Sequence, residues 1–421
     1  MKIRIVGGRI VDPGNNRDEI ADILIVDGKI VGAGEAVQPD LLIDATDKIV
    51  IPGLIDMHTH LREPGREDEE TIYTGSIAGV AGGFTTLVCM ANTTPPVDNG
   101  GLVRFILEAK KEATVLPVGA ITKSRMGEEL AEIGDMVEAG AVAISDDGDP
   151  VLDSGIMRRA LEYTKIFDIP VISHAEDKGL SGRGVVNEGV VALKLGLPGI
   201  PSIAEDIMVA RDIYLAKYTG GRVHFAHVST EGAVTLIREA KSDGVRVTAE
   251  VTPHHLVFTE QDVLANPYDT NYKVNPPLRT ERDRVALIEA LKDGTIDVIA
   301  TDHAPHASFE KELEFIDAPF GIIGLETALP VLVDKLVNTG ELDWMTFIAK
   351  LTVNPAKILG LDKKWLKEGE PAELVVFDPE AEWVFNTTRS LSRNSPFLGK
   401  RLKGKVLYTI VGERVWDFTG E

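Results

Sequence analysis

The stretch "IDMHTHLREPG" (55–65) places two histidines two residues apart and an arginine two residues further along. Alternate side chains of an extended strand share one face, so His58 and His60 project together, with Arg62 as a further candidate for that face. Two imidazoles beside a guanidinium suit a metal ion next to an anionic group. Alternate histidines at a strand end can also simply bond to backbone carbonyls, so this motif alone does not establish a metal site.

Four other motifs add histidines and carboxylates to this set. They are "SDDGD" with Asp146 and Asp147, "VISHAED" with His174, "RVHFAH" with His224 and His227, and "IATDHAPH" with Asp302. His224 and His227 are three residues apart and face opposite sides of a strand, so only one can point into a common site, and the terminal His227 is the better candidate. Neutral imidazoles with carboxylates and no thiolate suit Zn²⁺, Co²⁺ or Mn²⁺ in a site that keeps a position open for water.

The elements that must position these residues alternate between strands and helices. Eight strands are expected, at 53–58, 84–90, 115–121, 141–145, 170–174, 222–227, 245–251 and 296–301. Helices are expected between most of them, at 102–113, 154–167, 203–219, 232–244 and 281–294. This pattern predicts an α/β fold, a (β/α)8 barrel of the TIM type with lengthened loops. All nine histidines except His224 lie at or just beyond the carboxyl end of a predicted strand, where such barrels build active sites, which favours the metal interpretation.

Both ends of the sequence have a different pattern, with short strands and tight turns. Asp27-Gly28 between β-branched runs is a hairpin signal, and "AELVVFDP" and "GKVLYTIVGERVWDF" continue the style near the carboxyl terminus. Neither end has enough strands to bury a face alone. We therefore expect one small β-sandwich domain from residues 1–51 plus 365–421, and a barrel from residues 52–364.

Composition excludes several classes of partner. The formal charge of −22 repels phosphate backbones and anionic lipid surfaces, so we expect neither nucleic acid nor membrane as a partner. Cys89, the single cysteine, excludes an internal disulfide and agrees with a reducing compartment. The first residues meet glycine, aspartate and proline before a signal-peptide hydrophobic region could form. A cytoplasmic protein that acts on a small molecule is expected.

The motifs together resemble those of one enzyme family. In order, "GLIDMHTHLREPG", "MANTTPPVDN", "ISDDG", "SHAED", "HFAHVST", "TPHHL", "YKVNPPLR", "ATDHAPH" and "APFGIIGLET" are similar to the signatures of bacterial and archaeal type I dihydroorotases of the amidohydrolase superfamily. "GKIVGAGE" and "AELVVFDP" resemble the small β-domain of these enzymes. The resemblance implies a zinc-dependent cyclic amide hydrolase that reversibly closes N-carbamoyl-L-aspartate to L-dihydroorotate and water, in pyrimidine (UMP) biosynthesis.

The resemblance also implies a role for individual residues. His58 and His60 hold one metal ion, His174 and His227 hold a second, Asp147 bridges the two, and Asp302 binds the first while moving a proton. The implied cofactor is Zn²⁺, one or two ions per chain, with two expected. The implied substrate-binding residues, with the α-carboxylate contacts first and the ring-amide contacts last, are His60, Arg62, Asn92, His306, Asn275, Phe320 and Gly321.

One feature departs from the wider superfamily. Many of its members bridge their metals with a carboxylated lysine on strand 4, but "AVAISDDG" contains no lysine. Either Asp147 then bridges the metals, as in one branch of type I enzymes, or the second metal is weakly held, and Asp146 is the alternative ligand.

Two other functions stay open at this point. One is a different cyclic amidohydrolase, a dihydropyrimidinase, hydantoinase or allantoinase, although these usually carry the lysine and lack the "MANTTPP" and "YKVNPPLR" pair. The other is a non-catalytic homologue that serves as a scaffold for aspartate transcarbamoylase, although such relatives typically lose metal ligands. An active enzyme could also associate with that transcarbamoylase, and the sequence leaves homo-oligomer formation open.

Overall fold

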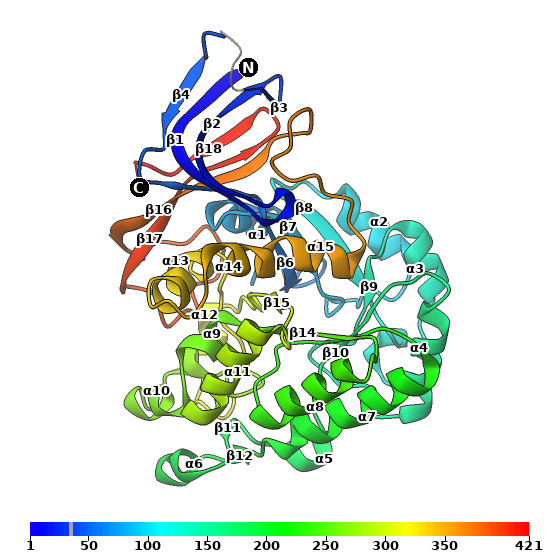
Figure 1. The fold of residues 1–421 in the computed structure, drawn as a ribbon. Helices are drawn as coiled ribbons and strands as arrows, with labels where there is room; N and C mark the ends of the chain where they lie inside the picture. Colours follow the sequence, from blue (N-terminus) through cyan, green and yellow to red (C-terminus); the bar gives the residue numbers. More distant parts are fainter. Residues whose placement is uncertain (33–36, 421) are drawn as a thin grey trace.

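The computed structural model describes residues 1–32 and 37–420 (Figure 1). A barrel ringed by helices occupies most of the chain, and a sheet built from both termini lies at one side of it. Positions 33–35 at the end of "GKIVGAGE" lie outside the described residues.

Eight parallel strands form the barrel, and each predicted strand has an observed counterpart. In chain order they are β6 (Leu54–Thr59), β7 (Phe84–Cys89), β8 (Thr114–Gly119), β9 (Ala143–Ile144), β10 (Val171–Ser173), β13 (Val223–Phe225), β14 (Val247–Val251) and β15 (Val298–Ile299). Neighbouring strands follow this same order around the ring. A parallel bridge between Thr59 and His303 joins the last strand to the first, with His60 N donating to His303 O at 2.9 Å. The predicted (β/α)8 barrel is confirmed.

Helices connect the strands and cover the barrel. The principal ones are α1 (Ile72–Ala81), α2 (Gly100–Glu108), α3 (Ile133–Ala139), α4 (Ser154–Thr164), α7 (Ile203–Thr219), α8 (Glu231–Ser242) and α11 (Glu281–Asp293). Side chains that accept N–H bonds fix several starts, including Asp153 before α4 and Thr230 before α8. Thr280 and Asp283 form a capping box at the start of α11.

Shorter elements lie in the lengthened loops and after the barrel. Between β10 and α7 come α5 (Lys178–Ser181), β11 (Val186–Asn187), α6 (Val190–Leu195) and β12 (Gly199–Ile200). Between β14 and α11 come α9 (Pro253–Val257) and α10 (Glu260–Ala265), and after β15 come α12 (Ser308–Lys311), α13 (Ala328–Leu332), α14 (Trp344–Leu351) and α15 (Val353–Leu359). The loops that follow β10, β14 and β15 leave the carboxyl ends of these strands and therefore surround the face where the predicted site residues lie.

Strands from both termini form one separate hydrogen-bonded sheet, as expected. Its order is β18 (Arg414–Asp417), β17 (Arg401–Val411), β16 (Glu373–Val384), β5 (Ile49–Pro52), β1 (Lys2–Asp12), β2 (Arg17–Val26) and β3 (Lys29–Val31), while β4 (Leu41–Asp44) pairs with β1. An apolar cluster that includes Ile3, Ile25, Val50, Leu374 and Ile410 is buried within it. The run "IVIPGLID" is thus divided at Gly53, where β5 ends and the barrel begins. An added Cβ at Gly53 would lie 2.2 Å from Thr85 Oγ1, so the crossing needs glycine.

The sheet and the barrel share a second buried cluster. Phe377 of β16 and Val406 of β17 belong to the same apolar core as Val80, Phe84 and Leu329 of the barrel. Within the described residues, no helix is both long enough and apolar enough to span a membrane.

Phe377→Ala tests how much this shared core stabilises the chain. The side chain is fully buried, so its removal should cost about 3–5 kcal/mol of unfolding free energy. The control Val384→Ala lies on the same strand at 41% exposure and should shift the denaturation midpoint far less. Equal midpoints for the two variants would contradict a core shared by sheet and barrel.

Candidate functional site

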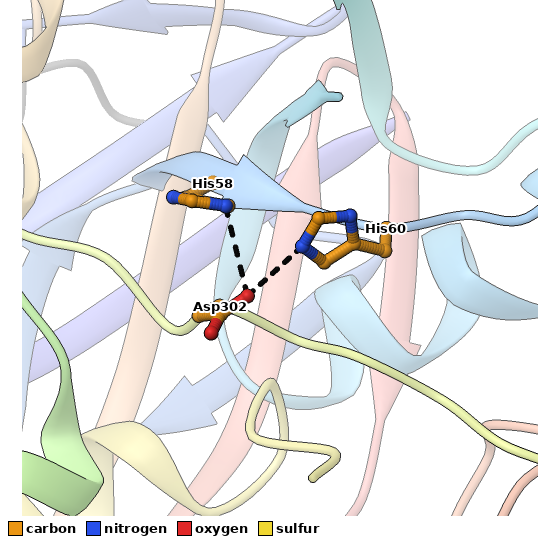
Figure 2. A group of neighbouring side chains, drawn as sticks. All are labelled: His58, His60 and Asp302. Atoms are coloured by element: carbon orange, nitrogen blue, oxygen red, sulfur yellow. Dashed lines mark hydrogen bonds and ion pairs between the residues drawn. The ribbon is translucent and has the colours of Figure 1, made fainter. Parts of the chain in front are cut away.

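The carboxyl ends of β6 and β15 bring three side chains together, as Figure 2 shows. Asp302 Oδ1 lies 2.9 Å from His60 Nε2 and 3.6 Å from His58 Nε2. Each imidazole therefore directs its own Nε2 toward Oδ1 of Asp302. All three residues are buried, and their ligand atoms are close enough together to hold one metal ion.

Asp147 lies between this group and a second pair of histidines. Its Oδ2 is 3.2 Å from His58 Nε2 and 3.5 Å from His60 Nε2. Its Oδ1 is 3.3 Å from His227 Nε2 and 3.5 Å from His174 Nδ1. Each oxygen of one carboxylate thus faces a different histidine pair, which is the placement of a group shared by two adjacent cations.

Asp146 has another role in the loop after β9. Its Oδ1 accepts hydrogen bonds from the N–H groups of Ile121 at 2.8 Å and Thr122 at 3.1 Å. Its Oδ2 accepts a third bond from the Thr122 hydroxyl. This carboxylate therefore holds the turn that follows β8, while the next residue, Asp147, contacts the histidines.

Other buried groups orient the histidine rings. His58 Nδ1 lies 2.6 Å from Glu250 Oε1, and Glu250 Oε2 lies 3.1 Å from His224 Nε2. His174 Nε2 lies 3.1 Å from Glu176 Oε2. A partner at one ring nitrogen fixes the tautomer and leaves the other nitrogen free to act as a ligand. Burial disfavours the charged form of both rings, but Asp147 and Glu250 raise the pKa of His58, and Asp147 and Glu176 raise the pKa of His174 to about 9. A metal ion would therefore have to displace a proton from each ring to bind it.

Unsatisfied atoms within this cluster fit a bound cation. His58 Nε2 and Asp147 Oδ1 are buried without a hydrogen-bond partner, and so is His227 Nδ1. In addition, His174 Nδ1 and His227 Nε2 face each other at 2.9 Å. Buried polar atoms are costly when unpaired, and a divalent ion would satisfy several of these lone pairs at once. The donor set of imidazole nitrogens and carboxylate oxygens suits Zn²⁺.

The two central carboxylates are ionised. Burial alone would raise the pKa of Asp302, but the neighbouring His58 and His60 lower it below the ordinary aspartate value. Burial is likewise outweighed at Asp147, whose pKa His58, His174 and His227 hold well below the usual range. Carboxylates must be deprotonated to bind a metal, so both side chains are in the form that a cation requires.

Backbone strain coincides with the site. Three predicted site residues that are not glycine have positive φ angles, namely Arg62 at 60°, His227 at 33° and Asp302 at 49°. Such conformations cost about 1–3 kcal/mol each and persist where surrounding contacts impose them. Their occurrence at three predicted site residues suggests that function constrains the local backbone.

The predicted carboxylate-binding residues form a connected group next to the histidines. The Arg62 side chain is 11% exposed, and its Nη2 lies 3.3 Å from His306 Nε2. His306 Nε2 is 2.7 Å from the carbonyl oxygen of Phe320, and Glu69 contacts both Arg62 Nε at 3.1 Å and His306 Nδ1 at 3.0 Å. Asn92 Oδ1 lies 2.8 Å from His60 Nδ1, which connects this group to the histidine cluster.

The residues predicted to contact a ring amide lie beside the second histidine pair and on the loop after β15. Asn275 Nδ2 donates to Glu176 Oε2 at 3.0 Å, and the same oxygen faces His174. Gly321 N donates to Lys273 O at 2.9 Å, which joins the 320–321 turn to the segment that carries Asn275. Hydrogen bonds thus connect Asn275 to the partner of His174 and place the 320–321 turn next to His306.

Sequence reasoning missed the carboxylates that orient these groups, Glu69, Glu176 and Glu250. Glu176 repeats the alternate spacing of His58 and His60 relative to His174, so that spacing could have indicated it. Glu250 is a charged residue inside the apolar strand β14, which is a signal of a buried partner. Glu69 lies in the charged run "REDEE" and carries no signal that separates it from its neighbours.

Comparisons with known proteins agree with this geometry. A family model described as dihydro-orotase-like matches residues 47–233. The dihydroorotase of Pelotomaculum thermopropionicum is 54% identical over 421 residues, covering 99% of this chain and 98% of the relative, and that of Geotalea daltonii is 51% identical over 423 residues, covering 99% of each. The solved L-hydantoinase (dihydropyrimidinase) of Arthrobacter aurescens superposes with a TM-score of 0.87 at 26% identity, covering 100% of this chain and 96% of its own.

The chain is thus more than half identical, over its full length, to two dihydroorotases. It also has the barrel fold and the histidine–carboxylate cluster described above. The chain belongs to the dihydroorotase family.

Proposed function

We propose that this protein is a dihydroorotase, which interconverts N-carbamoyl-L-aspartate and L-dihydroorotate in the synthesis of pyrimidines. In ring opening, water adds to the amide carbonyl carbon and the bond from that carbon to the ring nitrogen breaks. Ring closure is the reverse and releases one water molecule. The observation that carries the proposal is the two-sided histidine–carboxylate cluster around Asp147, with Asn92 beside His60 and the mostly buried guanidinium of Arg62 two residues after His60.

The proposed cofactor is Zn²⁺, two ions per chain. His58, His60 and Asp302 hold the first ion, His174 and His227 hold the second, and Asp147 lies between them. When bound, zinc lowers the pKa of a water molecule from 15.7 to about 7 and polarises a carbonyl group. The distances from both Asp147 oxygens to the two histidine pairs support this arrangement, and the bonds made by Asp146 support Asp147 as the bridge.

Asp302 moves the proton in the proposed reaction. Its lowered pKa keeps Asp302 ionised in the resting site, and as a carboxylate beside the reacting groups it accepts a proton from the attacking water and donates it to the departing ring nitrogen. In ring closure it carries the proton in the opposite direction. Its contact with His60 Nε2 holds one oxygen in place beside the reacting groups.

Binding of the substrate is assigned to groups on both sides of the cluster. Arg62, Asn92 and His306 bind the α-carboxylate, with His60 next to the substrate as a metal ligand, and a planar guanidinium suits a carboxylate through two parallel hydrogen bonds. Burial and the adjacent Arg62 lower the pKa of His306. Asn275 and the Phe320-Gly321 turn contact the ring amides.

Turnover of L-dihydroorotate and N-carbamoyl-L-aspartate by the purified, zinc-loaded protein tests the proposal directly. Dihydrouracil, hydantoin and allantoin serve as competing substrates, because the hydantoinase-type enzymes share this fold. The proposal fails if one of these is turned over faster than dihydroorotate, or if no substrate is turned over. We place the enzyme in the cytoplasm, where its small substrates are soluble.

Asp302→Asn should remove nearly all turnover while the protein stays folded. The change deletes the proton carrier, and general acid–base groups contribute about 10² to 10⁴ in rate. Steady-state assays and a thermal melt give the two readouts. The control Asp362→Asn, whose side chain is 81% exposed, should keep full activity, and an Asp302 variant within threefold of it would contradict the assignment.

Arg62→Lys should raise KM for both substrates more than it lowers kcat. An ammonium is a point charge and cannot reproduce the paired contact of a guanidinium with a carboxylate. Arg238→Lys, on the outer surface of α8 where it pairs with Asp293, controls for the chemical change itself. An unchanged KM for both substrates would place Arg62 outside the binding site.

Asp147→Ala should lose the second zinc ion first, because His174 and His227 alone make a weak site. Metal content per chain, measured by elemental analysis, is the readout. Asp146→Asn is the matched control and should keep both ions.

Removal of bicarbonate is a second test of the bridge. A carboxylated lysine forms by reaction with CO₂, whereas an aspartate needs no such reaction, so removal of bicarbonate should leave wild-type activity unchanged. Activity that follows bicarbonate would point to a lysine as the bridge.

A further inference from the structure

The segment "SLSRNS" (390–395) connects β16 to β17 but reaches the barrel loops. Residues 390–394 alternate between buried and exposed, with Ser390, Ser392 and Asn394 buried and Leu391 and Arg393 exposed, and Ser395 is buried as well. A period of two is that of extended chain with one face packed against the protein. The buried face is polar, so its hydrogen bonds must be made to the barrel.

The two serines of this face bind the loop that follows β6. Ser390 Oγ donates to Glu70 Oε2, and Ser392 Oγ donates to the carbonyl oxygen of Glu69 at 2.7 Å. Glu69 in turn contacts Arg62 and His306. The segment therefore supports the carboxylate that lies behind two proposed substrate-binding residues.

Asn394 uses its whole amide on the loop that follows β15. Its Oδ1 accepts from His306 N at 3.2 Å, and its Nδ2 donates to Ala304 O at 2.9 Å and to Gly321 O at 3.1 Å. Its own carbonyl oxygen accepts from Ile323 N at 3.0 Å. The side chain is only 4% exposed, so water does not compete for these bonds.

These bonds join two stretches that lie apart in the chain and that both face the substrate. His306 is assigned to the α-carboxylate and Gly321 to a ring amide. Gly321 has a φ of +123°, and an added Cβ would lie 2.6 Å from the Cβ of Ala304, so the turn is tightly packed against the strand end. Asn394 bonds to both the stretch that contains His306 and the stretch that contains Gly321. Among the described residues, no other side-chain amide bonds to both.

We propose that Asn394 is a positioning residue, which fixes the distance between the carboxylate-binding His306 and the Phe320-Gly321 turn. This inference rests on the proposed dihydroorotase function. A residue of the connection between two terminal strands thereby sets substrate affinity without contacting substrate. The metal ligands do not bond to Asn394, so its loss should affect substrate binding more than metal content.

Asn394→Asp is the sharpest test because it keeps the shape and the acceptor for His306 N. It replaces the two N–H donors with an oxygen that faces the carbonyls of Ala304 and Gly321. KM for dihydroorotate and for carbamoyl-aspartate should rise about tenfold or more, which corresponds to 1.4 kcal/mol. The fall in kcat should be smaller than the rise in KM, and zinc content should match the wild type.

Asn354→Asp is the matched control. Its Nδ2 also donates to a backbone carbonyl, that of Asp297 at 2.7 Å, which lies before β15 at the opposite end of the strand from the site. Asn394→Ser is used if the aspartate variant does not fold, because it introduces no buried carboxylate. It should also raise KM, but by less than the aspartate variant.

The outcomes separate the two proposals. An active wild type with a KM in both Asn394 variants within twofold of the Asn354 control overturns the positioning role alone. Loss of zinc, or a lower kcat at unchanged KM, also overturns it, because a general structural defect would produce those results. A wild type without dihydroorotase turnover overturns the proposed function and this inference with it.

Discussion

The structure of the site depends on one constraint. Two ionised carboxylates and four imidazoles are buried together at the carboxyl end of the barrel. Asp147 and Asp302 are almost fully excluded from water, and several polar atoms around them have no partner within the protein. Such a group is costly unless positive charge compensates it. The cluster therefore suits a bound divalent metal, which would also supply the chemistry of amide hydrolysis.

The rest of the fold positions these buried groups. The barrel places the ends of β6, β9, β10, β13 and β15 around one point, and the bridge between Thr59 and His303 closes the ring where the first histidines lie. Glu250 and Glu176 then orient individual rings. Loops from the barrel, with support from a segment between β16 and β17, form the surface that would bind the substrate. The small sheet is thus connected to the site as well as to the core.

Much of this follows from local sequence patterns. The eight barrel strands and helices such as 203–219 are predictable because apolar periodicity is a local property, and the histidines are conspicuous because they recur at strand ends. Strand lengths are less predictable, since β9 has two residues where five were expected. Contacts across long sequence distances could not be predicted. Asn394 is 88 residues from His306, and nothing in "SRNSPF" indicates that its amide bonds to two stretches of the loop that follows β15. The choice between Asp146 and Asp147 also needed the fold, because only the turn after β8 shows which carboxylate is already engaged.

The most direct measurement for the central claim is anomalous X-ray scattering at the zinc absorption edge, from crystals of the zinc-loaded protein. The account predicts two zinc positions per chain on either side of the Asp147 carboxylate, one next to His58, His60 and Asp302 and the other next to His174 and His227. A single position, or zinc bound to Asp146 with Asp147 turned away, would contradict it.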